Sequence, residues 1–254
     1  MTGKEAEKEA AFALVSKNIA ITLVEPQSAG NVGSVARAMR NTGFNNLTLV
    51  NPCGYLNNDG YSMACKASPL LFGAKVFSNI NDAVKDSGLV AGATRRQGRT
   101  RYPLLTIDEA VPKILELARK NKVSILFGRE DKGLKNDETP LCDILFEIPT
   151  HSGYPSINLS HAVFTVCYTL FNAECPKTPG IKTANSGEAD KMYAHMESTL
   201  RKLGYGDKGG EYLLQTILRS FKKLFGRTAL MQKEVNMLRG IFTQIEARIR
   251  TDKK

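Results

Sequence analysis

A glycine-bearing turn after an apolar run is the first place in this sequence where chemistry could occur. The run Ile19–Val24 is followed by Gly30-Asn31-Val32-Gly33 and an apparent helix, an order often found where a turn holds a phosphate. A dinucleotide fingerprint needs Gly-x-Gly-x-x-Gly and an acidic residue about 20 positions later, and both are missing. What remains is Asn31, with Arg37 six residues later and Arg40 three further on along the same helix side. The alternative is that both arginines are solvated helix charges.

A second segment with functional residue types runs from Ile125 to Glu138. An apolar run ends at Phe127, and Gly128 then lets the backbone come close to a ligand. Glu130 follows at the expected carboxyl edge of the sheet, where open α/β folds bind ligands. The alternative is an ordinary glycine-rich turn between a strand and a helix.

A third segment, Ile148 to Phe164, places Ser156, Asn158 and Ser160 where a loop enters an apolar helix. Small polar residues at such a position are commonly helix N-caps. A Ser-His hydrolase would also use a serine near a histidine, but it requires a Gly-x-Ser-x-Gly elbow. The sequence contains no such elbow, so this class is disfavoured.

The elements that must position these residues alternate between short apolar runs and helical patterns, which predicts a parallel α/β sheet. We expect strands at 19–24, 47–50, 89–91, 123–127 and 144–148, and helices at 34–41, 81–86, 107–120 and 158–171. A Pro- and Gly-containing stretch follows, and the pattern then becomes wholly helical over 189–203, 210–225 and 230–249. We therefore expect a short polar or helical N-terminal arm (1–17), an α/β domain (18–173), a linker (174–188) and a basic all-helical C-terminal extension (189–254).

Composition and charge limit the class of protein. The chain of 254 residues is 42% hydrophobic and 24% charged, as expected for a globular protein, and we expect no membrane span and no signal peptide. Five cysteines without a CxxC pair argue against a zinc site and favour reduced thiols in the cytoplasm. Of the formal net charge of +10, residues 174–254 carry +7, which indicates a polyanion partner or a solvated basic surface.

Taken together, the three segments resemble the three motifs of the SPOUT superfamily of RNA methyltransferases, in its TrmH-like 2′-O-ribose branch. Asn31 and Arg37 resemble the first motif, Phe127-Gly128-x-Glu130-x-x-Gly133-Leu134 the second, and Ile148-Pro149 with Ser156-Ile157-Asn158-Leu159-Ser160 the third. Ile157 departs mildly from the more usual leucine. The C-terminal helices are similar to the extension of the TrmJ group, which methylates the 2′-hydroxyl of nucleotide 32 in tRNA anticodon loops.

The resemblance implies a C-terminal trefoil knot, formed by residues 144–171, that binds S-adenosylmethionine, and a homodimer assembled across it. Knots are rare, and nothing in the periodicity itself points to one. By the same resemblance, the cofactor would be cradled by the backbone and small side chains of Ala93, Thr94, Gly128, Ile148, Ser156, Ile157 and Leu159.

The resemblance also implies five catalytic residues: Asn31, Arg37, Glu130, Ser156 and Asn158. The attack of a ribose 2′-oxygen on a sulfonium methyl needs mainly positioning and loss of the hydroxyl proton, without a metal. The family assigns proton removal to the arginine of the first motif, here Arg37. Because a guanidinium is effectively always protonated, a contact to the RNA phosphate that steadies the developing alkoxide demands less of it.

The remaining basic residues are candidates for RNA binding. Four arginines lie in the segment Thr94–Pro103, and a second patch lies in the C-terminal extension, so that with Arg40 the set is Arg40, Arg95, Arg96, Arg99, Arg101, Lys222, Lys223 and Arg227. The favoured substrate is tRNA, with ribosomal RNA as the alternative. A non-catalytic RNA-binding protein and a nucleotide-binding oxidoreductase remain the rival classes.

Overall fold

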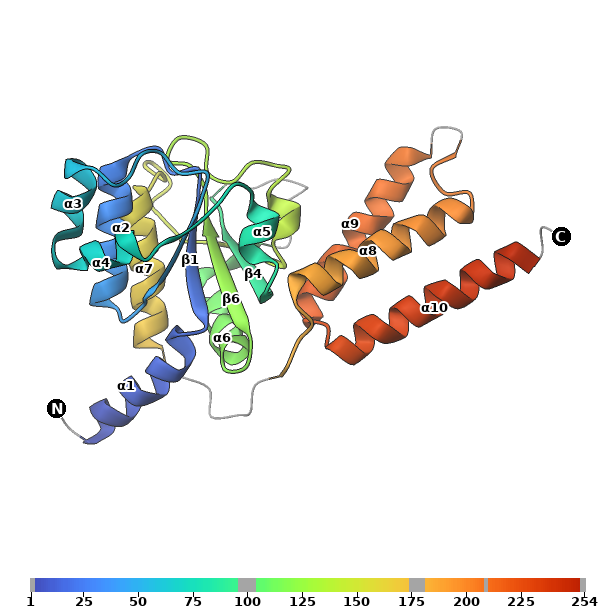
Figure 1. The fold of residues 1–254 in the computed structure, drawn as a ribbon, viewed down its shortest axis with the longest axis horizontal. Helices are drawn as coiled ribbons and strands as arrows, with labels where there is room; N and C mark the ends of the chain where they lie inside the picture. The colour runs from blue at the N-terminus through green and yellow to red at the C-terminus, as the bar shows by residue number, and fades with distance from the viewer. Residues whose placement is uncertain (1–2, 96–103, 174–180, 208–209, 252–254) are drawn as a thin grey trace.

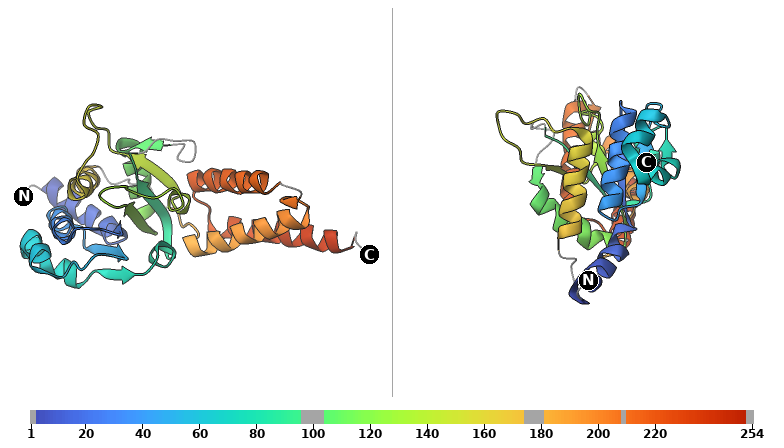
Figure 2. Two further views of the ribbon diagram at one scale, coloured as in Figure 1. Left: turned by 90° about the horizontal axis from the view of Figure 1, so that it is seen from above. Right: turned by 90° about the vertical axis from the view of Figure 1, so that its left-hand side faces the viewer.

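The computed structural model describes residues 3–95, 104–173, 181–207 and 210–251. A seven-stranded parallel sheet flanked by helices is followed by three long helices that extend away from it (Figures 1 and 2). The strands are β1 (Ile19–Val24), β2 (Asn46–Val50), β3 (Lys75–Phe77), β4 (Ser87–Ala93), β5 (Leu104–Thr106), β6 (Lys122–Phe127) and β7 (Ile144–Glu147). The α-helices of the sheet domain are α1 (Gly3–Ser16), α2 (Ala29–Asn41), α3 (Asn58–Ala64), α4 (Ser68–Phe72), α5 (Ile80–Val84), α6 (Ile107–Ala118) and α7 (Leu159–Asn172).

The tail consists of α8 (Ser186–Lys202), α9 (Glu211–Thr228) and α10 (Gln232–Thr251). It has a small apolar core of its own, formed by Ala184, Met192, Met196, Leu214, Leu218 and Val235. Two short 3₁₀ helices, Cys65–Ala67 and Thr139–Leu141, complete the described elements.

The strand order is β3-β2-β1-β6-β4-β7-β5, with every pair parallel. Strand β7 therefore lies between β4 and β5, which follow each other in the sequence. Phe146 pairs with Ala93 on one side and with Leu105 on the other. The crossing that would tie a knot involves the β4–β5 connection, whose residues 96–103 lie outside the described part of the chain.

All five predicted strands are present, with ends within two residues of the prediction. The structure adds β3 and β5, three residues each, at the two edges of the sheet. Strands this short give no alternation pattern that a sequence can reveal. The predicted parallel α/β sheet with an all-helical C-terminal extension is confirmed.

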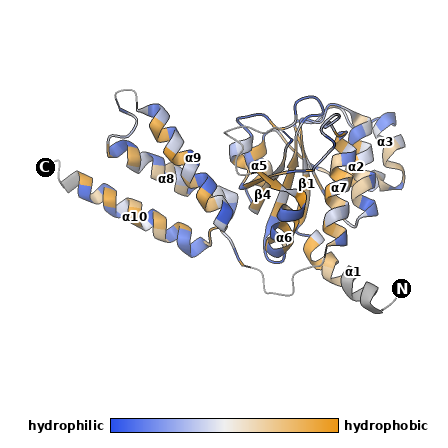
Figure 3. Cartoon of the chain, turned by 180° about the vertical axis from the view of Figure 1, so that it is seen from behind, coloured by the Kyte–Doolittle hydropathy of each residue, from blue (hydrophilic) through white to orange (hydrophobic). Residues whose placement is uncertain are grey.

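The two faces of the sheet are covered unequally. One face carries the main core, where the strands pack against α1, α2, α6 and α7. The other face carries a smaller cluster around Val24, Val90 and Leu126, under α5 and the β6–β7 connection. The buried strands are mostly hydrophobic, as Figure 3 shows for β1 and β4.

The N-terminal arm forms the helix α1. Two of its apolar residues, Phe12 and Val15, are buried in the main core. The ring of Phe12 packs edge-on against Phe44 and Phe171, with centroids 5.3 Å apart in both pairs. Burial of these rings makes the end of the arm a part of the domain.

Gly30 and Gly33, which the sequence analysis assigned to a turn, both lie in the first turns of α2, and Gly33 has a packing role. A Cβ on Gly33 would lie 2.2 Å from the carbonyl oxygen of Gly60, because α2 and α3 are in backbone contact there. A Cβ on Gly30 would have only ordinary contacts, the nearest being Met63 Cγ at 3.6 Å. Gly33 is therefore required by the contact between two helices.

These two glycines form a matched pair for measurement. Alanine favours a helix over glycine by up to about 1 kcal/mol, so Gly30→Ala should leave stability unchanged or raise it. Gly33→Ala should lower the free energy of unfolding by about 1–3 kcal/mol, because α3 must move away. Urea unfolding followed by circular dichroism measures both, and equal stabilities of the two variants would contradict this account of the α2–α3 contact.

Candidate active site

The strand register brings the carboxyl ends of four strands to one edge of the sheet. Leu23 of β1 pairs with Phe127 of β6, so the segments that follow these strands start side by side. The end of β4 and the residues after β7 lie at the same edge. The segments that follow β1, β6 and β7 thus meet where open α/β sheets bind ligands. In the sequence, the first two are about 100 residues apart and the last two about 30.

The loop after β6 is unusually tight. A Cβ on Gly128 would lie 2.0 Å from the carbonyl carbon of Gly133, and the Gly133 backbone N–H donates to Arg129 O at 2.8 Å. Gly133 has a φ of +62°, a conformation that favours glycine. The close approach that Gly128 permits is therefore to its own loop, in addition to any ligand.

A buried ion pair holds this loop, and the sequence analysis missed it. The Arg129 side chain is 4% exposed and contacts Glu138 through two hydrogen bonds, of 2.9 Å from Nη1 and 2.8 Å from Nη2. Its Nε and Nη2 also lie 2.6 Å from the two carboxylate oxygens of Glu25. Arg129 therefore connects the segment after β1, the loop after β6 and the segment before β7. Its only sequence signal is its place beside Gly128.

Glu25 shows the electrostatic effect of this arrangement. It has a φ of +48°, which is uncommon for a residue with a side chain. The hydrogen bond from Arg129 lowers the pKa of the Glu25 carboxyl, and Lys135 at 3.6 Å adds to the effect. The charged form of Glu25 is thus favoured at the edge of the site.

Glu130 follows Arg129 in the loop after β6 and organises a polar cluster on the side of the loop opposite to Arg129. Its carboxylate accepts hydrogen bonds from the backbone N–H groups of Gln27 (2.9 Å) and Ser28 (3.2 Å) and from Asn31 Nδ2 (3.0 Å). The Ser28 hydroxyl caps α2 by accepting from Asn31 N. The loop before α2 and the first turn of that helix are in this way attached to β6.

Asn158 extends the same cluster to α7. Its Nδ2 donates to Asn31 Oδ1 at 3.0 Å, while its Oδ1 caps α7 by accepting from the backbone N–H and the hydroxyl of Ser160. The side chains of Glu130, Asn31 and Asn158 therefore form one hydrogen-bonded chain. The structure brings together these three of the five predicted catalytic residues.

A cavity of about 180 Å³, called here the strand-end cavity, lies beside this cluster. Its walls come from the ends of β4 and β6, from the residues after β7 and from the start of α7. All seven residues that the resemblance assigns to the cofactor line it: Ala93, Thr94, Gly128, Ile148, Ser156, Ile157 and Leu159. Arg95, predicted to bind RNA, lies at the same cavity.

A second, more open depression, called here the outer hollow, adjoins the strand-end cavity. Both are lined by Glu130, Ser156, Ile157 and Leu159, which form a shared wall. Asn31 and Asn158 line the outer hollow only, together with Tyr154 and His161. Four of the five predicted catalytic residues therefore face one depression, and Ser156 stands on the wall between the two.

The fifth residue, Arg37, lies elsewhere in the described structure. It is exposed on the side of α2 that faces α3, where its Nη1 donates to Cys65 Sγ at 3.6 Å. It lines neither the strand-end cavity nor the outer hollow. Within a single chain, the first motif therefore contributes Asn31 to the polar cluster but not Arg37.

The predicted RNA-binding residues are distributed over several places. Arg40 is exposed on α2 and donates to Asn45 Oδ1 at 2.9 Å. Lys222, Lys223 and Arg227 line a separate cavity between the sheet domain and the tail. Arg96, Arg99 and Arg101 lie outside the described residues. No helix in the described ranges is long and apolar enough to cross a membrane.

Comparison with known proteins decides the family. Residues 18–168 match the model of the SpoU rRNA Methylase family, and residues 187–254 match the C-terminal domain of the tRNA methyltransferase TrmJ. The chain belongs to the SpoU rRNA methylase family. This membership makes it a methyltransferase and confirms the resemblance to the 2′-O-ribose branch and to the TrmJ group.

Relatives in this family align over nearly the whole chain. The tRNA (cytidine-2′-O-)-methyltransferase TrmJ of Methanocaldococcus jannaschii is 35% identical over 88% of this chain and 98% of its own. The tRNA (cytidine/uridine-2′-O-)-methyltransferase TrmJ of Citrobacter koseri is 33% identical, with 91% and 97% covered. The crystal structure of TrmJ from Z. mobilis ZM4 superposes with a TM-score of 0.76 at 33% identity, covering 89% of this chain and 98% of that one.

Removal of the buried cation tests the role of Arg129. Arg129→Met should lower the free energy of unfolding by about 3–5 kcal/mol, because it leaves Glu138 buried without its partner. The matched control is Arg201→Met, which also removes contacts to two carboxylates, Glu197 and Glu211, but on the surface of the tail. That change should cost no more than about 1 kcal/mol.

The pH dependence gives a second readout of the same pair of variants. The Glu25 carboxyl has a lowered pKa in the folded protein. It therefore stabilises the fold at pH values above its pKa in the unfolded chain, and this stabilisation is lost as the pH falls. The stability gap between wild type and Arg129→Met should therefore narrow below a pH of about 4. Urea unfolding at pH 7 and at pH 3.5 measures this difference in the free energy of unfolding. If Arg129→Met lowers the free energy of unfolding at pH 7 no more than Arg201→Met does, the role given to Arg129 is refuted.

Proposed function

We propose that the protein transfers a methyl group from S-adenosylmethionine to a ribose 2′-hydroxyl of tRNA. The observation that carries the proposal is the wall shared by the strand-end cavity and the outer hollow. A donor in the first and an acceptor in the second would be held next to each other, which is the main requirement of an in-line transfer. The tRNA substrate is supported by the TrmJ relatives and by the match of the tail to the TrmJ C-terminal domain.

The strand-end cavity suits this cofactor chemically. Phe127, Ile157 and Leu159 offer apolar surface for an adenine, while the ends of β4, β6 and β7 present backbone groups that hydrogen-bond polar atoms. The chemistry that S-adenosylmethionine would supply here is an electrophilic methyl group. No metal is needed for its transfer, since the leaving sulfide is neutral.

The polar cluster would orient the acceptor. Because the Asn31 side chain is bonded to both Glu130 and Asn158, its position is fixed before RNA arrives. Ser156 lies on the shared wall, and its hydroxyl would hydrogen-bond the ribose. Ser156 and Asn158 are exposed, so water reaches the outer hollow and can accept the proton of the attacking hydroxyl.

Arg37 is proposed to act in the site of a second copy of the chain. Arg37 would contact an RNA phosphate there and steady the developing alkoxide. The apolar surface of α7 supports a homodimer: the rings of Phe164 and Tyr168 stack on each other with centroids 5.8 Å apart, yet are 42% and 50% exposed. A second copy would cover these rings and bring its Arg37 to the outer hollow.

Finer parts of the proposal follow from the resemblance. They are the threaded knot, nucleotide 32 of the anticodon loop as the target, a cytoplasmic location, and RNA contacts by the basic residues. Arg40, Arg95 and the tail lysines Lys222 and Lys223 are described residues that could meet phosphates. Ribosomal RNA is the alternative substrate, because the family model that matches the sheet domain carries that name.

Methyl transfer from labelled S-adenosylmethionine to total tRNA and to ribosomal RNA tests the proposal. We expect incorporation into tRNA alone, at the 2′-oxygen of one anticodon-loop nucleotide when the modified ribose is mapped. Incorporation into ribosomal RNA alone would replace the substrate. Absence of transfer to either, by a folded protein that binds the cofactor, would leave a non-catalytic RNA-binding protein.

The contribution of Arg37 can be tested with mixed dimers. Arg37→Ala and Asn158→Ala should each abolish transfer, while Arg37→Ala keeps the wild-type affinity for S-adenosylmethionine. When the two variants are co-expressed and exchange subunits randomly, half the dimers carry one intact site, so about a quarter of the wild-type activity should return.

Two controls complete that experiment. Arg119→Ala removes an arginine from the end of α6, which lines neither the strand-end cavity nor the outer hollow. This variant, expressed without a second variant, should keep full activity. If the mixed dimers remain inactive although mixed species are detected by mass spectrometry, Arg37 does not act across subunits. A fully active monomer would refute the dimer as well.

A further inference from the structure

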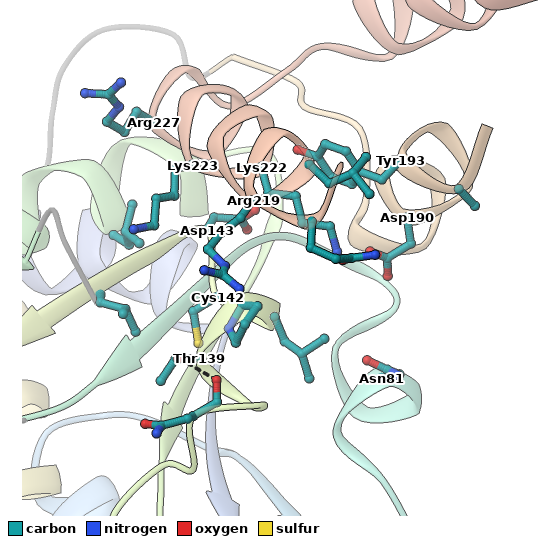
Figure 4. A pocket seen from close by; sticks show the side chains of 18 of the residues that line it. Asn81, Thr139, Cys142, Asp143, Asp190, Tyr193, Arg219, Lys222, Lys223 and Arg227 are labelled. Carbon is teal, nitrogen blue, oxygen red and sulfur yellow. Dashed lines mark hydrogen bonds between the residues drawn. The ribbon is translucent and has the colours of Figure 1, made fainter. Parts of the chain in front are cut away.

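A second large cavity lies away from the methyl-transfer site, between the sheet domain and the tail (Figure 4). It has a volume of about 590 Å³, within the range of about 300–1,000 Å³ typical of small-ligand pockets. One side is formed by the start of β7 and the turn before it, and the other by α8 and α9. We call it the tail cavity.

The tail cavity has a defined shape because α9 is in direct contact with the sheet domain. A Cβ on Gly226 would lie 2.7 Å from the carbonyl oxygen of Asp143, so the helix touches the backbone at the start of β7. The Asp143 side chain is partly buried there and accepts the backbone N–H of Val90 at 2.7 Å. Burial raises the pKa of Asp143 to about 6, while the nearby Lys222 favours its charged form.

Cationic side chains of α9 gather at the tail cavity. Figure 4 shows Arg219, Lys222 and Lys223 between α9 and the start of β7. Within the described ranges, neither Arg219 nor Lys222 forms a salt bridge with a carboxylate. Lys223 is partly buried, and this burial together with the nearby Arg219 lowers the pKa of Lys223. Arg219 and Lys223 repel each other, which an anion between them would relieve, whereas Lys222 already lies near the carboxyls of Asp143 and Asp190.

The lining also holds the carboxylates of Asp143, Asp190 and Glu197, several neutral polar side chains, and a group of apolar and aromatic side chains. Leu105, Leu141 and Leu145 of the sheet domain face Leu218 and Tyr193 of the tail. Lys222 Nζ lies 5.2 Å from the centre of the Tyr193 ring. A pocket that joins an aromatic and apolar side to a group of cations suits a flat ring attached to a phosphate.

We propose that the tail cavity binds one unstacked nucleotide of the RNA substrate, with its base on the apolar side and its phosphate at Arg219, Lys222 and Lys223. This inference rests on the proposed function, since it takes RNA to be the substrate. Its site is separate from the methylated ribose: the strand-end cavity and the outer hollow share no lining residue with the tail cavity. The protein would thus hold the RNA at two places, with chemistry at only one.

Two changes of different kinds test the tail cavity. Arg219→Gln removes a charge, and Ala194→Phe fills space from an exposed position on α8 without changing the charge. Matched controls on the exposed face of α10 are Arg239→Gln and Ala247→Phe. The probe is a fluorescent oligouridylate of five nucleotides, whose affinity is measured by anisotropy at several salt concentrations.

Both cavity variants should bind the oligonucleotide at least fivefold more weakly than wild type and should raise KM for tRNA to a similar degree. Their kcat and their affinity for S-adenosylmethionine should be unchanged, since neither residue lines the methyl-transfer site. Arg219→Gln should also flatten the log–log salt dependence by about 0.7 for the lost phosphate contact. The two controls should behave as wild type.

Wild-type affinity and KM in both cavity variants would overturn the proposal. A second result would also overturn it. If wild type binds free cytidine monophosphate, both cavity variants lose that binding, and tRNA affinity and KM for tRNA stay unchanged, then the ligand of the cavity is a free nucleotide. Failure of the proposed function gives a different result, namely no methyl transfer to tRNA by the wild-type protein.

Discussion

The ion pair between Arg129 and Glu138, with Glu25 as its third member, is the interaction on which the site depends. A guanidinium that is 4% exposed must have charged partners, because an unpaired buried charge is strongly unfavourable. Those partners come from the segment after β1 and from the segment before β7. The requirement to pair one cation therefore fixes the relative position of three chain segments at the carboxyl edge of the sheet.

Glu130 uses the position that Arg129 secures. These neighbours in the sequence serve opposite sides of the loop. Arg129 points into the protein, and Glu130 accepts hydrogen bonds from two backbone N–H groups before α2 and from the Asn31 side chain in its first turn. Asn31 and Asn158 then complete a chain of hydrogen bonds that reaches α7. Because each amide is already oriented by its partner, the outer hollow presents a preformed polar surface, and little ordering remains to be done when a ligand binds.

Parallel strands predicted only that Glu130 lies at the carboxyl edge of the sheet. That Asn31, Glu130 and Asn158 share one site was expected from the resemblance to the three SPOUT motifs, and the structure places them within hydrogen-bonding distance. The part played by Arg129 could not be predicted, since the pattern does not reveal which side of a glycine loop faces inward. Gly33 was read as part of a turn, whereas its contact with Gly60 depends on how two helices cross. The edge strands β3 and β5 were too short to show a pattern.

The β6–β7 connection links the two ends of the molecule. Its first part, from Gly128 to Gly133, lines the strand-end cavity, and its last part, from Thr139 to Asp143, lines the tail cavity. Glu138 stands between them and holds Arg129. The tail touches this connection at Asp143 with no space for a side chain on Gly226. The same short stretch of chain therefore lines both cavities and contacts the tail, and the ion pair of Glu138 with Arg129 holds it between them.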